Sequence, residues 1–190
     1  MSASAPTLWT IGHSNTEVRD LVRDLQAHGI QAVADVRSWP RSRYAPWFDQ
    51  EALSQTLKDA GIQYVWMGPE LGGRPDDPAL YQPDGKVRYD LVAETELFRD
   101  GVRRLREGME KMRVVIMCSE ENPERCHRRL LVTRVLLGDG VAVRHIRRGG
   151  IVENEPGFVV QTGLFGNEEL PWTSTASVSQ RRLPKVSSPD

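Results

Sequence analysis

The chain has 190 residues, of which 39% are hydrophobic and 27% charged, and its formal net charge is −1. This composition excludes a disordered acidic chain, and no apolar run approaches the roughly 20 residues of a transmembrane helix. The first residues lack the basic start and apolar stretch of a signal peptide, and two cysteines, Cys118 and Cys126, give no disulfide framework. We therefore expect a cytoplasmic protein that has no membrane partner.

Short apolar runs alternate with segments of helical spacing along the first three quarters of the chain. Within the segment Arg113 to Cys118, residues Val114 to Met117 are continuously apolar, which is typical of a parallel strand covered on both faces. The predicted strands are residues 8–11, 30–36, 62–67, 113–118 and 141–146. The predicted helices run over about residues 16–28, 49–60, 89–111 and 126–137.

Strands that alternate with helices imply parallel crossover connections. We therefore predict an α/β fold, an open, mostly parallel sheet of about five strands with helices on both faces, in a Rossmann-like three-layer sandwich. Residues 1–148 are expected to form a single domain. Residues 149–190 are expected to form a C-terminal extension with a short hairpin around Pro156-Gly157 and a frayed tail rich in Ser and Pro.

Polar and reactive residues follow four of the five predicted strands. Because the carboxyl ends of parallel strands meet at one edge of the sheet, where open α/β folds bind ligands, we expect a site at that edge. The strand-end residues are, in chain order, His13, Ser14 and Asn15; Asp35 and Arg37; Cys118 and Glu120; and His145. After the fourth strand, the chain also brings Cys126, His127 and Arg128 to the start of a predicted helix.

Local charge favours an anionic ligand at this edge. Residues 99–148 contain 13 Lys or Arg against seven Asp or Glu. Arg37 and Arg128 have forked donors suited to phosphate or carboxylate. Arg128 also falls in a predicted first helical turn, where free backbone N–H groups attract anions. Arginines on solvated helix faces are the alternative interpretation for most of these residues.

Five segments carry a family resemblance. They are TIGHSN (Thr10–Asn15), DVRSWPRSR (Asp35–Arg43), ELGGR (Glu70–Arg74), MCSEENPERCHRRL (Met117–Leu130) and VRHI (Val143–Ile146). On these motifs the chain resembles, over about residues 8–146, the bacterial and archaeal family of the domain of unknown function number 488. The resemblance implies a compact α/β domain and a shared site, with no established reaction. This chain has Cys-Ser-Glu at 118–120 where many relatives have Cys-Ala-Glu.

Four residues are candidates for catalysis. Cys118 is the candidate nucleophile, with His127 favouring its thiolate, and Asp35 and Glu120 are candidates for acid–base work. Each has a structural alternative, because a free cysteine commonly packs in the core and a buried aspartate needs an ion-pair partner such as Arg37. The candidate substrate-binding residues are His13, Ser14, Asn15, Arg37, Arg41, Gly72, Gly73 and Arg128.

The leading functional hypothesis is an enzyme, a hydrolase or transferase, whose cleft binds a small anionic or nucleotide-like substrate. The first alternative is a nucleotide- or nucleic-acid-binding module without catalysis, in which the aromatic residues of the loop 39–48 stack on bases. The second is a metal-binding protein that uses Cys118, Cys126 and His127. These residues lack the short paired spacing of a zinc knuckle, so we predict no metal site. With no dinucleotide or phosphate-loop pattern, we also predict no cofactor.

Overall fold

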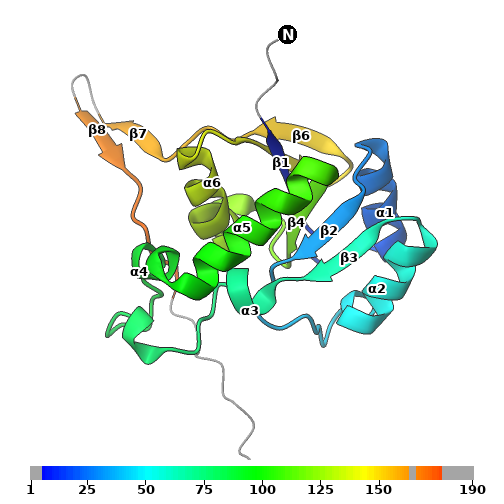
Figure 1. Cartoon of the computed structure of the whole chain (residues 1–190), viewed down its shortest axis with the longest axis horizontal. Helices are drawn as coiled ribbons and strands as arrows, with labels where there is room; N and C mark the ends of the chain where they lie inside the picture. Colours follow the sequence, from blue (N-terminus) through cyan, green and yellow to red (C-terminus); the bar gives the residue numbers. More distant parts are fainter. Residues whose placement is uncertain (1–5, 163–165, 177–190) are drawn as a thin grey trace, which may run out of the picture.

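Parallel strands form the centre of the molecule, as the alternating pattern predicts (Figure 1). This computed structural model describes residues 6–162 and 166–176, so the predicted frayed tail from residue 177 onward lies outside the described residues. The strands are β1 (Thr7–Gly12), β2 (Ala32–Asp35), β3 (Gln63–Trp66), β4 (Val114–Cys118), β5 (Ala142–Arg147) and β6 (Ile151–Asn154). Their order is β3-β2-β4-β1-β5-β6, and β6 is an antiparallel edge strand while the other pairings are parallel.

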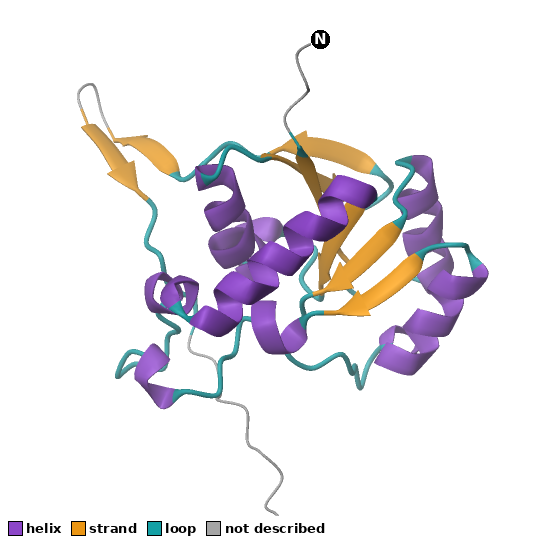
Figure 2. Ribbon diagram, viewed as in Figure 1, coloured by secondary structure: helices purple, strands orange, loops and turns teal. Residues whose placement is uncertain are grey.

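Helices cover both faces of this sheet, which confirms the predicted three-layer α/β architecture (Figure 2). One face packs against α1 (Val18–Ala27) and α2 (Gln50–Asp59). The other face packs against α3 (Gly68–Leu71), α4 (Tyr89–Glu94), α5 (Glu96–Lys111) and α6 (Arg134–Gly138).

The alternation of side chains along β4 divides the core and positions the site. Val115 and Met117 pack on the side of α1 and α2, whereas Ile116 and Cys118 pack on the side of α5 and α6. All five residues of β4 are buried, and burying one such apolar side chain stabilises the fold by roughly 1.5–3 kcal/mol. Cys118 thus ends the best-covered strand and faces the α5 side.

Two predicted helices differ in the structure. The helix predicted over 89–111 breaks at Thr95, whose side-chain oxygen accepts a hydrogen bond from the Phe98 N–H and caps the start of α5. The helix predicted from Cys126 begins instead at Arg128, as a π-helical segment (Arg128–Thr133) that leads directly into α6. Such wide turns are frequent at functional sites.

The segment after β5 packs against the α/β layers. Pro156 and Gly157 lie in the connection between β6 and the hairpin of β7 (Val159–Thr162) and β8 (Gly166–Glu169), so they do not form a hairpin turn. Beyond β8, the chain runs back to pair at Thr173 with Arg88. We call residues 173–176 the C-terminal strap.

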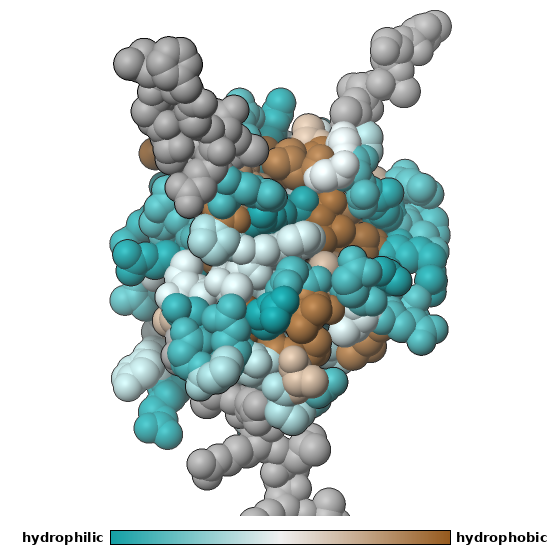
Figure 3. Space-filling model, turned by 90° about the vertical axis from the view of Figure 1, so that its left-hand side faces the viewer, coloured by the Kyte–Doolittle hydropathy of each residue, from teal (hydrophilic) through white to brown (hydrophobic). Residues whose placement is uncertain are grey.

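The surface on the side that carries α4 is mainly hydrophilic, with smaller hydrophobic patches between the polar residues (Figure 3). Among the residues described, there is no helix with both the length and the apolar character of a membrane span.

Candidate functional site

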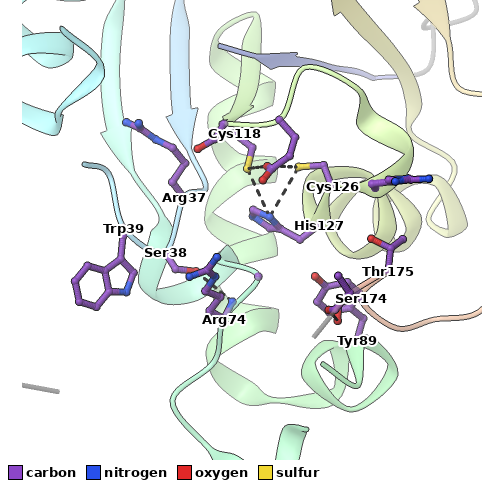
Figure 4. A pocket seen from close by; sticks show the side chains of 15 residues that line it. Arg37, Ser38, Trp39, Arg74, Tyr89, Cys118, Cys126, His127, Ser174 and Thr175 are labelled. Atoms are coloured by element: carbon purple, nitrogen blue, oxygen red, sulfur yellow. Dashed lines mark hydrogen bonds between the residues drawn. The ribbon is translucent and has the colours of Figure 1, made fainter. Parts of the chain in front are cut away.

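An open cavity of about 240 Å³ lies beyond the carboxyl ends of β2 and β4, at the edge of the sheet that the sequence indicated (Figure 4). Cys118, Cys126 and His127 lie side by side in its wall, and Glu120 is beside them. The C-terminal strap supplies a further wall through Ser174, Thr175 and Ala176. Residues from five separate regions of the sequence therefore enclose one small pocket.

The two cysteines, His127 and Glu120 form a tight cluster. The thiol of Cys118 donates a hydrogen bond of 3.1 Å to Glu120 Oε2, and the thiol of Cys126 donates one of 3.5 Å to the same oxygen. His127 Nδ1 lies 3.6 Å from Cys118 Sγ and 3.9 Å from Cys126 Sγ. Both thiols are buried, whereas the Glu120 side chain is exposed. We refer to these four residues as the thiol cluster.

The orientation of the imidazole in the thiol cluster is fixed from the far side. His127 Nε2 donates a hydrogen bond of 2.8 Å to the backbone carbonyl oxygen of Val36. Because a carbonyl oxygen only accepts, Nε2 carries a hydrogen, and in the neutral ring Nδ1 presents its lone pair to the sulfurs. The ring lies against Gly73, where a Cβ atom would come within 2.6 Å of the His127 Cγ atom.

The loop that carries Glu120 is held by a buried arginine. Arg128 is fully buried and donates hydrogen bonds to the backbone carbonyls of Glu120 and Glu121. The Glu120 carbonyl also sits so close to Gly12 that any Cβ at that position would overlap it. The main chain at Glu120 is therefore fixed by packing and hydrogen bonds, even though its carboxylate is exposed.

The two thiols differ in pKa. The hydrogen bond with Cys126, together with burial, raises the pKa of Cys118 well above its ordinary value. Burial acts against the thiolate of Cys126, but the hydrogen bond with Cys118 and the charge of Arg128 lower its pKa well below the usual range. Burial also acts against protonation of His127, but its hydrogen bond with Cys126 raises its pKa. Cys126 is therefore the more acidic thiol.

Three other predicted site residues form a buried network of their own. Asp35 and Arg37 make an ion pair of 2.6 Å, and Tyr64 donates to the same carboxylate oxygen at 2.7 Å. Arg37 also donates to His13 Nε2 at 3.1 Å, and burial with the nearby Arg37 charge lowers the pKa of His13 to about 4. Although Arg37 lines the cavity, its guanidinium points away from the thiol cluster (Figure 4).

The structure brings five of the predicted site residues to the cavity and leaves the others outside its lining. The five are Arg37, Gly73, Cys118, Glu120 and His127. Those outside are His13, Ser14, Asn15, Asp35, Arg41, Gly72 and Arg128. Arg128 lies behind the loop of Glu120, and Arg41 lines a separate hollow with Tyr64 and Trp66.

Two arginines that the sequence analysis did not select line the cavity. Arg74 and Arg125 are exposed, and within the described parts of the chain neither forms a salt bridge. Both lie in the motif segments quoted above, which was the signal that could have identified them. The strap residues, by contrast, had no sequence signal that connected them to the cavity.

The fold and the pocket define a three-layer α/β protein with a thiol cluster at the carboxyl edge of its parallel sheet. Residues 17–135 match the family described as "Domain of unknown function DUF488". This match covers more than half of the chain, so the protein belongs to that family, which confirms the resemblance found in its motifs. Comparison with curated proteins gave no match, and comparison with solved structures gave none either.

Proposed function

We propose that the protein is an enzyme that binds a small anionic substrate in this cavity and carries out hydrolysis or group transfer over the thiol cluster. The observation that carries the proposal is that Arg74 and Arg125, two arginines without a salt bridge among the described residues, line the same cavity as the cluster. Guanidinium groups bind phosphate and carboxylate in bidentate fashion, so both arginines are suited to hold an anion beside the sulfurs.

The size and walls of the cavity favour a phosphate ester or a similar compact anion. A volume of about 240 Å³ accommodates the anionic end of a substrate rather than a large ligand. Trp39 lines the same cavity and is 51% exposed, so its indole offers a surface on which a base can stack. A nucleotide-like substrate would use both features.

The thiol cluster supplies the reactive groups. Glu120 and His127 can each take up and release a proton close to a bound substrate. The sulfurs can act in two ways, either as a thiolate nucleophile or as ligands of a metal ion that polarises the bound anion. In both cases the chemistry takes place at the end of β4.

A ligand panel tests the proposal. Thermal unfolding is followed with phosphate, AMP, a sugar phosphate and a dicarboxylate, and with neutral adenosine as comparison. A ligand at about 100 times its Kd adds roughly 2.7 kcal/mol, so an anion that binds should raise the Tm by several degrees. Arg74→Ala and Arg125→Ala should weaken binding by about tenfold or more, because each removes a charged hydrogen bond.

Arg19→Ala, an exposed arginine on α1, is the matched control and should bind like the wild type. The anion that gives the largest shift is then incubated with the enzyme. Glu120→Gln should abolish its turnover and keep most of its affinity, whereas a binding module has no turnover to lose. An absence of any anion-specific shift, or a shift that survives both arginine substitutions, overturns the proposal.

A further inference from the structure

We propose that Cys118, Cys126 and His127 bind one zinc ion at the wall of the cavity, and that the exposed carboxylate of Glu120, which lies beside both sulfurs, rotates to become the fourth ligand. This inference goes beyond the proposed function, because it requires no anionic substrate and predicts a resident ion. Two thiolates, an imidazole nitrogen and a carboxylate oxygen are ligand types that zinc takes in four-coordinate sites.

The spacing of the donor atoms fits such a site. Zinc bonds of about 2.3 Å to sulfur and about 2.1 Å to nitrogen or oxygen separate tetrahedral ligand atoms by about 3.4–3.8 Å. In the thiol cluster, the sulfurs lie 3.6 and 3.9 Å from His127 Nδ1, and 3.1 and 3.5 Å from Glu120 Oε2. The two sulfurs and Nδ1 lie within 4.8 Å of one another. The side chains of Cys118, Cys126 and His127 point toward one another (Figure 4).

The groups around the cluster orient the imidazole as a ligand. Histidine ligands commonly donate their second ring N–H to a carbonyl or carboxylate, which fixes the tautomer and raises the basicity of the ligand nitrogen. The bond from His127 Nε2 to the Val36 carbonyl has this role, and it directs Nδ1 to the sulfurs. Because Gly73 has no side chain, the ring can occupy this position.

Binding exchanges protons for the ion. Two thiolates and a neutral imidazole bind the ion, so the protons that these groups hold beforehand pass to the buffer and no electron is transferred. A site that used only surface carboxylates would release none.

Cobalt(II) titration of the full chain tests the site. The protein is purified without an affinity tag, stripped with a chelator and titrated with Co²⁺, which reports tetrahedral thiolate ligation through its visible and near-ultraviolet absorption. We expect one Co²⁺ per chain, displacement by one Zn²⁺, and a release of protons measured by calorimetry in buffers of different ionisation enthalpy.

Ligand variants give the decisive comparison. Cys118→Ser, Cys126→Ser and His127→Gln should each weaken Co²⁺ binding. Loss of an outer-shell partner costs about 10–100-fold in metal affinity, and loss of a ligand should cost more. Glu120→Gln should weaken it about tenfold and change the Co²⁺ spectrum. Glu124→Gln, an exposed carboxylate in the same loop, should bind like the wild type. Because Glu120 is exposed, its variant folds even if the cysteine variants do not.

The outcomes separate this inference from the proposed function. Arg74→Ala and Arg125→Ala should retain Co²⁺ binding, because neither arginine is a proposed ligand. If the protein binds Co²⁺ but no anion, the proposed enzyme is refuted and the zinc site is not. Zinc should also protect both cysteines of the wild type from alkylation by iodoacetamide. Absence of stoichiometric binding, a Co²⁺ spectrum without thiolate absorption, or equal affinity of the Glu120→Gln and Glu124→Gln variants overturns the zinc site.

Discussion

His127 Nε2 donates its 2.8 Å hydrogen bond to the carbonyl of Val36, a residue 91 positions earlier in the chain. Val36 directly follows Asp35, whose ion pair with Arg37 fixes the end of β2. The buried ion pair therefore holds the carbonyl that orients the imidazole. In this way, residues outside the cavity support the groups that line it.

Asp35→Asn should lower the free energy of unfolding by about 3–5 kcal/mol, because it leaves the buried Arg37 cation without its partner. Urea unfolding measures the change. Asp59→Asn, at the exposed end of α2, is the control and should change stability by less than about 0.5 kcal/mol. A loss below about 1 kcal/mol for Asp35→Asn would show that this carboxylate is not structural, and would return it to the candidate catalysts.

His13 should make the fold less stable in acid. Its pKa is about 4 in the folded protein and about 6.5 when unfolded, so between these values the unfolded chain binds more protons. Stability should therefore decline as the pH falls from about 6.5 to 4, by about 3 kcal/mol for this residue. The comparison is urea unfolding of the wild type and His13→Gln across this range. Parallel pH profiles would contradict the assignment.

Gly73→Ala should displace the His127 imidazole, because the new Cβ would lie 2.6 Å from the Cγ atom. We expect Co²⁺ binding to weaken by about tenfold or more, as for loss of an outer-shell partner. Gly108→Ala is the matched control, since its Cβ would meet no atom closer than 3.8 Å and it lies inside α5. Equal Co²⁺ affinity of the two variants would exclude a role for Gly73 in placing the ring.

Arg128→Lys should destabilise the protein by about 2 kcal/mol although the charge is kept, because one ammonium cannot replace the fork that reaches two backbone carbonyls. Amide hydrogen exchange of residues 119–122 should become faster, since this loop loses its anchor. Arg99→Lys, a surface position on α5, provides the comparison for the unfolding and exchange measurements. Unchanged exchange in the loop would argue against this anchoring role.

The parallel sheet could be predicted because its strands have local signals. The apolar run that became β4 and the alternation of strands and helices are visible within short windows. The edge strand β6 lacks such a signal, since all four of its residues are exposed and its pairing with β5 defines it. The break at Thr95 arises from a side-chain cap that competes with helix continuation.

The candidate site was predictable in position but not in detail. The rule that ligands bind at the carboxyl edge of a parallel sheet located Cys118, Glu120 and His127. Which arginines face the cavity depends on tertiary packing, so Arg128 is buried behind a loop whereas Arg125, three residues earlier, lines the pocket. The strap at residues 173–176 reaches the cavity through its pairing with residues 87 and 88, a contact with no local signature.

The most direct test of the proposed function is the position of a bound oxyanion in a crystal. Crystals grown without sulfate or phosphate are soaked in selenate, and diffraction is measured at the selenium absorption edge. We predict an anomalous peak inside the cavity, contacted by Arg74 and Arg125 and adjacent to Cys118 and Cys126. Selenate bound only at other surfaces, with none in the cavity, would contradict the assignment of this pocket as the substrate site.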